Sequence, residues 1–499
     1  MTEQEQVPGA DAFSASRTRV DELVDWLEGA EAAALSHADL EQDLSGKGRE
    51  LLRQFYQDHL DLRAIRELRR TGVVDAAGLP RNTLDTDHSR TLTTVFGTVR
   101  VRRFAYRKRG KPNLHPADAQ LNLPEEQYSY GVRQVAAQEA AQKSFAAAAE
   151  TIKARTGEGI GLRQVEALVH HAAEDFDAFY QEQERPPVAD GAVVVCSTDA
   201  KGIVMRPKAL RPATAAAASR AAPPLETRLS PGEKANRKRM AQVGAVYTVA
   251  PCPRTPKDIL GPHGAERSPA PQAQQKWLTA SVVENTRTVI TSIFQEAERR
   301  DPGHSHRRLW LVDGNNDQIA GIQEEARERK LSATILIDFI HVLEYVWSAA
   351  WCFFPHDDPA AEAWVRDRGL AILNGKAETT AAAIRGKATA LHLRPEERAN
   401  ADRCADYLRN KLPYLDYPTA LSEGWPIATG VIEGACRHLV KDRMDITGAR
   451  WCLTTAEAVL KLRALRSNGE FERYWNFHVQ QQYRRVHLRR YAPGVLTAA

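Results

Sequence analysis

The chain has 499 residues, of which 43% are apolar, so roughly two to four domains are expected, with enough apolar side chains to fill their cores. Its 68 basic and 64 acidic side chains leave a formal charge of +4, so any nucleic-acid-binding surface must come from local clusters of basic residues. Six isolated cysteines, a polar start and the lack of a long apolar run argue against a structural zinc, a signal peptide and a membrane span, and predict a cytoplasmic protein.

Residues 1–90 are predicted to be mainly helical, because apolar residues such as Leu23, Trp26 and Leu27 recur at three- and four-residue steps. Two β-rich runs follow between residues 91 and 109 and meet at Gly97-Thr98, which predicts a hairpin. The second run is strongly basic, and we expect it to grip DNA phosphates through Arg100, Arg102, Arg103, Arg107, Lys108 and Arg109.

A second helical block extends to about residue 184. Residues 144–155, a glycine-rich turn and residues 162–171 have the pattern of a helix-turn-helix with Arg163 and Gln164 near the start of its second helix. A plain helical hairpin gives the same pattern, so both interpretations stay open. We predict that residues 91–185 form a DNA-binding region.

The region 190–357 has an alternating strand and helix pattern. Ala192 to Asp199 is a short apolar run that ends in polar residues, as a buried strand does. The next strands are expected at Gly202–Met205 and Met240–Val249, followed by a helix, a strand ending at Asp313, a helix and a strand ending at Asp338. This order predicts an α/β catalytic core with a ribonuclease-H-like mixed sheet.

Residues 358–422 turn helical and charged, which predicts an all-helical insertion into this core. Residues 423–470 would supply a helix with Glu433 and the end of the core. Residues 471–499 form a basic C-terminal tail, which would bind DNA or be a solvated helix.

Three carboxylates are the candidate catalytic and metal-binding residues. Asp199 and Asp313 each follow an apolar strand, so they would converge at one edge of a sheet, and Glu433 would approach from a helix. Cutting or joining phosphodiesters needs an activated oxygen nucleophile and a stabilised leaving oxygen, and two metal ions about 3.5 to 4 Å apart supply both. The alternative is that these acids cap helices and turns.

Asp338 and His341 lie one helical turn apart and would face one site as an auxiliary pair, unless they are a capping aspartate and a core histidine. Several basic and aromatic residues near the acids are candidates for DNA contact. Arg437 and Lys441 would share a helical face with Glu433, and a lone tryptophan beside Arg450 would stack an unpaired base or pack in the core. These DNA-contact candidates are Lys201, Arg437, Lys441, Arg450 and Trp451.

The same segments resemble the ISKra-type insertion-sequence transposases of bacteria, which belong to the acidic-triad (DDE) class. The resemblance covers most of the chain from about residue 90 onward. The strings that carry it are Asp199-Ala-Lys-Gly202, Arg237-Lys-Arg-Met-Ala-Gln-Val-Gly-Ala-Val-Tyr-Thr248, Leu311-Val-Asp-Gly-Asn-Asn316, Asp338-Phe-Ile-His-Val-Leu-Glu-Tyr345 and Thr429-Gly-Val-Ile-Glu-Gly-Ala-Cys-Arg-His-Leu-Val-Lys-Asp-Arg-Met444.

The resemblance implies a ribonuclease-H-like catalytic domain, two Mg²⁺ or Mn²⁺ ions, and cleavage and strand transfer at terminal inverted repeats. It assigns the triad to Asp199, Asp313 and Glu433, and a conserved Asp-x-x-His pattern of related transposases to Asp338 and His341. Ala200 departs from the family, which more often has glycine there. Double-stranded DNA is the expected partner, a homodimer or larger assembly would pair the two ends, and the protein would associate with the bacterial nucleoid. A nuclease without strand transfer and a catalytically silent DNA-binding protein are the alternatives.

Overall fold

A computed structural model describes residues 11–220, 237–262, 264, 266–446 and 448–496. The chain divides into two units: Met1–Gln181 together with Glu470–Ala499, and Glu182–Gly469. The two units are described separately below. Among the described helices, none is both long and apolar enough to cross a membrane.

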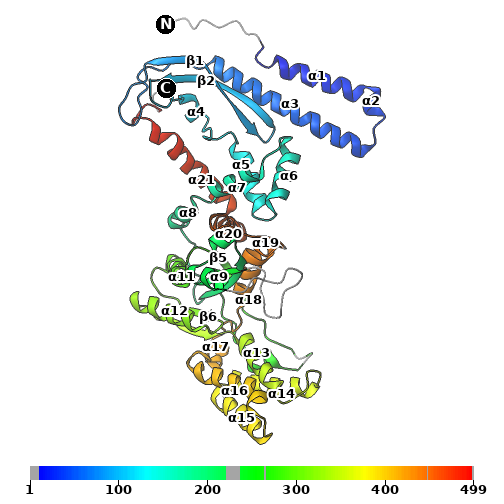
Figure 1. Ribbon diagram of the computed structural model, residues 1–499, viewed down its shortest axis with the longest axis vertical. Coiled ribbons are helices and arrows are strands. Elements are labelled where there is room, and N and C mark those ends of the chain that lie inside the picture. Colours follow the sequence, from blue (N-terminus) through cyan, green and yellow to red (C-terminus); the bar gives the residue numbers. More distant parts are fainter. Residues whose placement is uncertain (1–10, 221–236, 263, 265, 447, 497–499) are drawn as a thin grey trace. The chain divides into compact units, whose positions relative to one another are not determined.

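The first unit contains an antiparallel hairpin of β1 (Thr83–Thr94) and β2 (Gly97–Arg107). The predicted hairpin is therefore confirmed, although β1 begins before the expected start at residue 91. Its early residues are mostly polar, and none of residues 83–91 is buried, so they lack the alternation that marks a strand. Gly97 has φ +125°, a conformation that favours glycine at this tight connection. The long helix α3 (His37–Ile65) packs against β2 (Figure 1).

The first unit also contains a group of three helices, α5 (Tyr130–Ala140), α6 (Phe145–Thr156) and α7 (Leu162–Ala172). Helices α5, α6 and α7 contact one another, and α6 ends at Gly157 in the left-handed conformation. The helix, turn and helix predicted at residues 144–171 are thus present. The bounds are α1 (Ser14–Glu28), α2 (Ala30–Ala33), α4 (Pro116–Gln120), α5 (Tyr130–Ala140), α6 (Phe145–Thr156), α7 (Leu162–Ala172), α8 (Phe176–Glu182), α21 (Phe471–Val486) and η4 (Leu488–Arg490).

The predicted basic tail after residue 470 is the helix α21, and it belongs to the first unit. The ring of Tyr474 meets that of Phe179 edge-on at 5.4 Å. The His478 imidazole lies 2.7 Å from the Asp175 carboxylate, and both side chains are buried. Segments from the two ends of the chain therefore complete one core.

The second unit is built on a mixed five-stranded sheet in the order β5-β4-β3-β6-β7. Strand β4 is antiparallel to both of its neighbours, whereas β6 is parallel to both of its neighbours. The predicted mixed α/β class is thereby confirmed. The bounds are β3 (Val193–Val204), β4 (Lys238–Val249), β5 (Gln274–Ser281), β6 (Arg308–Val312) and β7 (Thr334–Ile337).

Two strand predictions were wrong. The strand expected to end at Asp199 and the strand expected from Gly202 are one strand, β3, because its pairing with β4 continues from Val193 to Val204. The third strand of the antiparallel half is β5, which the sequence pattern did not indicate. Its first three residues are exposed, and Pro271 lies just before it, so the segment looks like a loop.

Every described element between β7 and α18 (Gly430–Ala435) is helical, as the pattern of residues 358–422 predicts. Its helices share one apolar core with the sheet, in which Val195 and Leu309 lie with Trp364 and Leu408. The helices of this unit are α9 (Pro212–Arg220), α10 (Pro256–Leu260), α11 (Thr286–Arg300), α12 (Asn316–Glu328), α13 (Phe339–Ala350), α14 (Pro359–Leu373), α15 (Ala377–Ala390), α16 (Pro395–Asn410), α17 (Tyr417–Ser422), α18 (Gly430–Ala435), α19 (Asp442–Met444), α20 (Leu453–Ser467), the 3₁₀ turns η1 (Pro207–Ala209) and η2 (Leu412–Tyr414), and the π-helical segment η3 (Cys436–Lys441).

Candidate functional site

The register of the parallel strands, continued past their last paired residues, places three aspartates in one row. Strands β3 and β6 pair up to Cys196 and Trp310, and the same register continued for three residues sets Asp199 opposite Asp313. Strands β6 and β7 pair up to Val312 and Ile337, so the next position sets Asp313 opposite Asp338. The Asp338 N–H donates to the Val312 carbonyl oxygen at 2.8 Å, which holds the two strand ends together.

Asp199 lies on a part of β3 that pairs with only one of its two neighbouring strands. Its backbone still pairs with β4, opposite Val243, but β6 has already ended its pairing with β3. The half-buried Asp199 carboxylate accepts a hydrogen bond from the Cys436 thiol at 3.2 Å. Burial and the adjacent negative charge of Asp199 raise the pKa of Cys436 well above its usual value, while Lys201 opposes this shift.

Asp313 follows the last residue of β6 and is held by a tight turn. Its Oδ1 accepts a hydrogen bond from the Asn315 N–H at 2.8 Å. Gly314 has φ +94°, and a Cβ atom there would lie 2.7 Å from the Tyr407 hydroxyl oxygen, so glycine is required. That hydroxyl donates to the Asp313 carbonyl oxygen at 3.2 Å. The helical insertion, through α16, therefore helps to fix the position of Asp313.

Thr429 links Asp338 to Glu433. The Asp338 side chain is fully buried, and its Oδ2 accepts hydrogen bonds from both the N–H (3.0 Å) and the hydroxyl of Thr429. The same hydroxyl lies 3.3 Å from Oε1 of Glu433, one turn further along α18. The other oxygen of Asp338 accepts from the Ile340 N–H at 2.7 Å and caps α13. Asp338 thus orients two helices at the edge of the sheet.

His341 completes a group of possible metal ligands. Among the described residues, single ligand atoms of Asp338, His341 and Glu433 all lie within 4.8 Å of one another. Burial alone would lower the pKa of His341, but its hydrogen bond with Glu344 and the charges of Asp338, Glu344 and Asp313 raise it above the ordinary value. Because the charge of Asp313 acts on the His341 imidazole, Asp313 lies near the predicted auxiliary pair Asp338 and His341.

The arrangement differs in one respect from the predicted triad. Glu433 groups with the auxiliary pair Asp338 and His341, whereas Asp199 and Asp313 are not members of that group. Carboxylate oxygens suit Mg²⁺ and Mn²⁺, and an imidazole beside them also suits Mn²⁺ and softer ions. Because Oδ2 of Asp338 already accepts two hydrogen bonds, its remaining capacity for a cation lies on Oδ1. We therefore interpret Asp338 as a positioning residue.

The basic candidates near the site have mixed environments. Lys201, Lys441 and Arg450 are exposed, as a phosphate-contacting residue must be. Arg437 is also exposed but lies 3.6 Å from the Asp442 carboxylate. The π-helical segment η3 widens the turn after α18, so the four-residue steps from Glu433 to Arg437 and Lys441 no longer keep one face.

The base-stacking role expected for Trp451 does not fit its surroundings. Its side chain is 5% exposed, and the indole Nε1 donates to the Met444 carbonyl oxygen at 3.0 Å. The Arg443 guanidinium lies over the ring at 4.7 Å. Trp451 therefore packs inside the unit, which is the core-packing alternative considered above.

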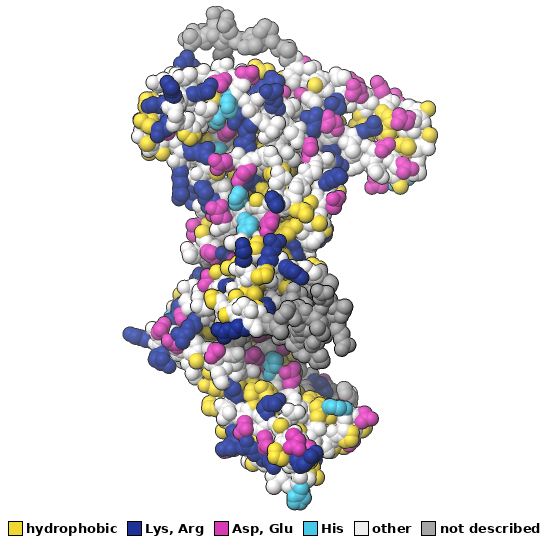
Figure 2. Space-filling view, in the orientation of Figure 1, with side chains coloured by type: hydrophobic (Ala, Val, Ile, Leu, Met, Phe, Trp, Pro, Cys, Tyr) yellow, Lys and Arg dark blue, Asp and Glu magenta, His cyan; other side chains and the backbone are white. Residues whose placement is uncertain are grey.

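Within the first unit, the basic hairpin presents most of its predicted cations to solvent. Arg103 is the exception, because it is buried and its guanidinium lies 2.8 Å from Asp118. Lys and Arg side chains are exposed on the face that carries β1 and β2 (Figure 2). The exposed members of the predicted set are Arg100, Arg102, Arg107, Lys108, Arg109, Arg163 and Gln164. Of these, Gln164 also caps the start of α7 through the Gly161 N–H at 2.9 Å.

Three residues of the site were not predicted. Thr429, Cys436 and Lys411 each contact or neighbour one of the acids. Lys411 is buried, and its ammonium donates to Asn316. Burial lowers the pKa of Lys411, and the charge of Asp313 opposes this shift. The four-residue step from Thr429 to Glu433 was a usable signal, since both lie on one face of a helix. Nothing in the spacing of Lys411 indicated its place.

No protein-family model and no curated protein matches the chain.

Proposed function

We propose that the second unit is a ribonuclease-H-like catalytic domain and that the chain is a DNA transposase of an insertion sequence, which cleaves and joins DNA at terminal inverted repeats. The sheet supports this proposal, because three antiparallel strands are followed by two that run parallel to the first, with helices α11 and α12 between them. The helices between β7 and Glu433 also fit this proposal, as a helical insertion into a catalytic core of this kind.

One observation carries the proposal. By extension of the strand register, Asp199, Asp313 and Asp338 fall in one row at the edge of the parallel strands, and the Thr429 hydroxyl links Asp338 to Glu433. Four carboxyl groups would repel one another there unless cations neutralise them. A site of this composition suits phosphodiester chemistry that depends on Mg²⁺ or Mn²⁺.

In this proposal, Asp199, Asp313 and Glu433 would hold two divalent cations, which when bound would activate the oxygen nucleophile and stabilise the leaving oxygen. Asp338 positions Glu433 through Thr429, and His341, whose pKa is raised by its acidic neighbours, is assigned a place beside the scissile phosphate. The exposed Lys201 extends the contact with the DNA backbone.

The partner is double-stranded DNA. We assign recognition of the element ends to the first unit, with its exposed basic hairpin and the helices α6 and α7. Pairing two ends requires two copies of the chain, so the active assembly is a homodimer or larger.

A cleavage and strand-transfer assay on DNA with terminal inverted repeats tests the proposal. Wild type should be active with Mg²⁺ or Mn²⁺ and inactive with EDTA. Asp199→Asn, Asp313→Asn and Glu433→Gln should each lower the rate at least about a hundredfold, because each removes a charged ligand. Asp317→Asn is the matched control, since Asp317 is an exposed acid on the neighbouring helix α12. Full activity in any of the three variants would exclude this triad.

A nuclease that cuts without strand transfer is the second candidate within the same fold. A pre-cleaved end with a free 3′-hydroxyl separates the two, because a transposase joins it to target DNA and such a nuclease does not. A protein that binds the ends and neither cuts nor joins would instead be a catalytically silent DNA-binding protein.

A further inference from the structure

The first unit contains a cavity of about 720 Å³ that the proposed catalytic site does not use. Its walls come from the end of α3 and the loop that follows α3, from strand β2, and from helix α4. Its wall includes the aliphatic side chains of Leu60, Leu62, Val101 and Leu121. A cavity of this size is much larger than an inorganic anion requires and falls in the range of small-molecule sites.

The lining of this cavity carries a strong excess of positive charge. It includes six arginines but one carboxylate, Glu67. Burial raises the pKa of Glu67, and its Oε2 already accepts a hydrogen bond from the Phe104 N–H at 2.8 Å. Among the described residues, no carboxylate forms an ion pair with the arginines at positions 63, 66, 69 and 102. Arg103 is neutralised by Asp118.

The dipole of α3 explains part of this excess. Arg63 and Arg66 lie at the C-terminal end of the helix, where positive side chains are favourable. Arg69 and Arg70 lie beyond the helix, and Arg102 comes from a strand, so the dipole does not account for them. Positive side chains on the wall of a cavity favour an anion inside it.

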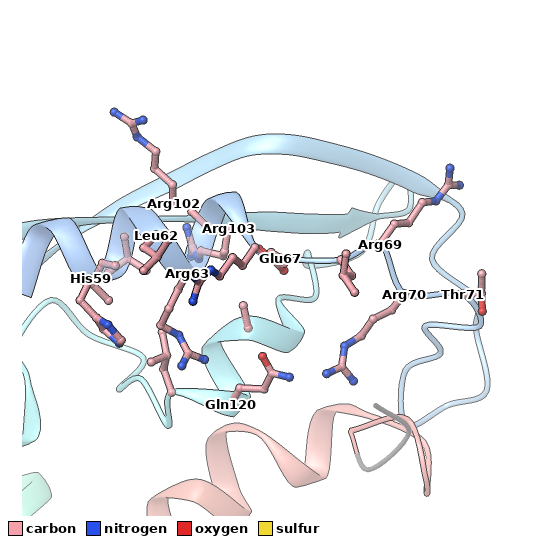
Figure 3. A pocket seen from close by; sticks show the side chains of 17 residues that line it. His59, Leu62, Arg63, Glu67, Arg69, Arg70, Thr71, Arg102, Arg103 and Gln120 are labelled. Carbon is pink, nitrogen blue, oxygen red and sulfur yellow. The ribbon is translucent and has the colours of Figure 1, made fainter. Parts of the chain in front are cut away.

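The side chains divide by direction (Figure 3). Arg63 from α3, Arg70 from the following loop and Gln120 from α4 extend toward the same space, with Gln120 between the two arginines in this view. Arg69 and Arg102 turn outward. Arg70 is additionally fixed by a hydrogen bond from its Nη1 to the Val495 carbonyl oxygen at 3.3 Å. Two guanidinium groups that approach one space from different elements are suited to a phosphate group.

We propose that this cavity is a nucleotide-binding site, with a phosphate held between Arg63 and Arg70 and the sugar and base against the aliphatic wall. A nucleotide matches both the charge and the volume, whereas inorganic phosphate matches the charge alone. The nucleotide comes either from a DNA strand or from the free pool, and both have this chemistry. The site is independent of the proposed cleavage, because it uses none of the catalytic residues.

Binding of dAMP, inorganic phosphate and labelled duplex DNA by the full chain in EDTA tests the proposal. Arg63→Gln should weaken binding of dAMP about tenfold, because one charge-assisted hydrogen bond is lost. Ala117→Leu keeps the charge and fills part of the cavity, so it should weaken dAMP but leave inorganic phosphate unchanged. Arg17→Gln, at an exposed position on α1 in the same unit, is the matched control and should bind dAMP as wild type does.

Competition identifies the source of the nucleotide. Displacement of labelled DNA by dAMP indicates a nucleotide of the DNA strand, and dAMP binding without displacement indicates a free nucleotide. The proposal is overturned if wild type binds no dAMP, if Arg63→Gln binds it as tightly as Arg17→Gln does, or if Ala117→Leu has no effect. These binding experiments contain EDTA, which prevents the proposed cleavage. Their outcome therefore does not test the catalytic proposal, which the cleavage and strand-transfer assay tests separately.

Discussion

Replacing Thr429 by valine removes one hydroxyl from the centre of the candidate site and keeps the shape of the side chain. In the native structure this hydroxyl donates to the buried Asp338 carboxylate and lies 3.3 Å from Glu433. Valine cannot make either contact. The Thr429 and Ile340 N–H groups would remain as donors to Asp338.

The size of the effect follows from burial. A hydrogen bond to a charged group contributes about 1.5–3 kcal/mol, and more of this is lost where water cannot replace the donor. Asp338 is 0% exposed, so water has no access to the vacated position. We therefore expect Thr429→Val to lower the free energy of unfolding of the second unit by about 1.5–3 kcal/mol.

Urea unfolding followed by tryptophan fluorescence measures this change, because most of the tryptophans lie in the second unit. Thr429→Ser restores the hydroxyl and should recover most of the lost stability. Thr389→Val is the matched control, since the Thr389 hydroxyl donates to a backbone carbonyl on the exposed face of α15, and it should change stability by less than about 0.5 kcal/mol. Equal stability of Thr429→Val and Thr389→Val would refute the reasoning.

Three further predictions concern single residues of the second unit. Burial would raise the pKa of Asp301, but hydrogen bonds from the turn before β6 lower it to about 2, so Asp301→Asn should cost about 1–2 kcal/mol at pH 7. Since the folded-state pKa is lowered, this stability is present above pH about 4 and is lost as the pH falls toward 2, so the melting temperatures of variant and wild type should converge there. Cys436 should react with iodoacetamide at pH 7.5 far more slowly than the half-buried Cys252, because burial raises the pKa of the Cys436 thiol. Mass spectrometry of the labelled protein measures both reactions, and equal labelling of the two cysteines would contradict this. Gly424→Ala should lower the melting temperature by several degrees, because φ is +73° and a Cβ atom would lie 2.2 Å from the Cys252 nitrogen; an unchanged melting temperature would show that the loop shifts freely.

Much of the sheet could be predicted from apolar runs, and the exception at β3 has a physical reason. Strand β6 no longer pairs with β3 at residues 200–202, so this part of β3 is less buried. Its sequence therefore indicates the end of a strand. The antiparallel pairing with β4 nevertheless continues to Val204. Local periodicity reports burial on both faces of a strand, whereas pairing depends on a partner far away in the sequence.

The acids of the site were predictable individually, but their grouping was not. Asp199, Asp313 and Asp338 were each placed by an apolar strand, and their shared row follows from strand order, which the sequence indicates only in part. The contact of Glu433 with Asp338 depends on Thr429 and on the length of the helical insertion. The buried Lys411 near Asp313 also comes from that insertion, and no local pattern marks it.

The composition of the first unit from both ends of the chain has a consequence for biosynthesis. On the ribosome, the segment that ends at Gln181 emerges before the whole second unit, yet its helix α8 lacks the packing of Tyr474 until α21 has been translated. The second unit has all of its strands and helices earlier and can fold first. A product truncated after residue 469 would therefore retain every candidate catalytic carboxylate and lack a complete first unit, so proteolysis should remove the orphaned N-terminal segment faster than the rest.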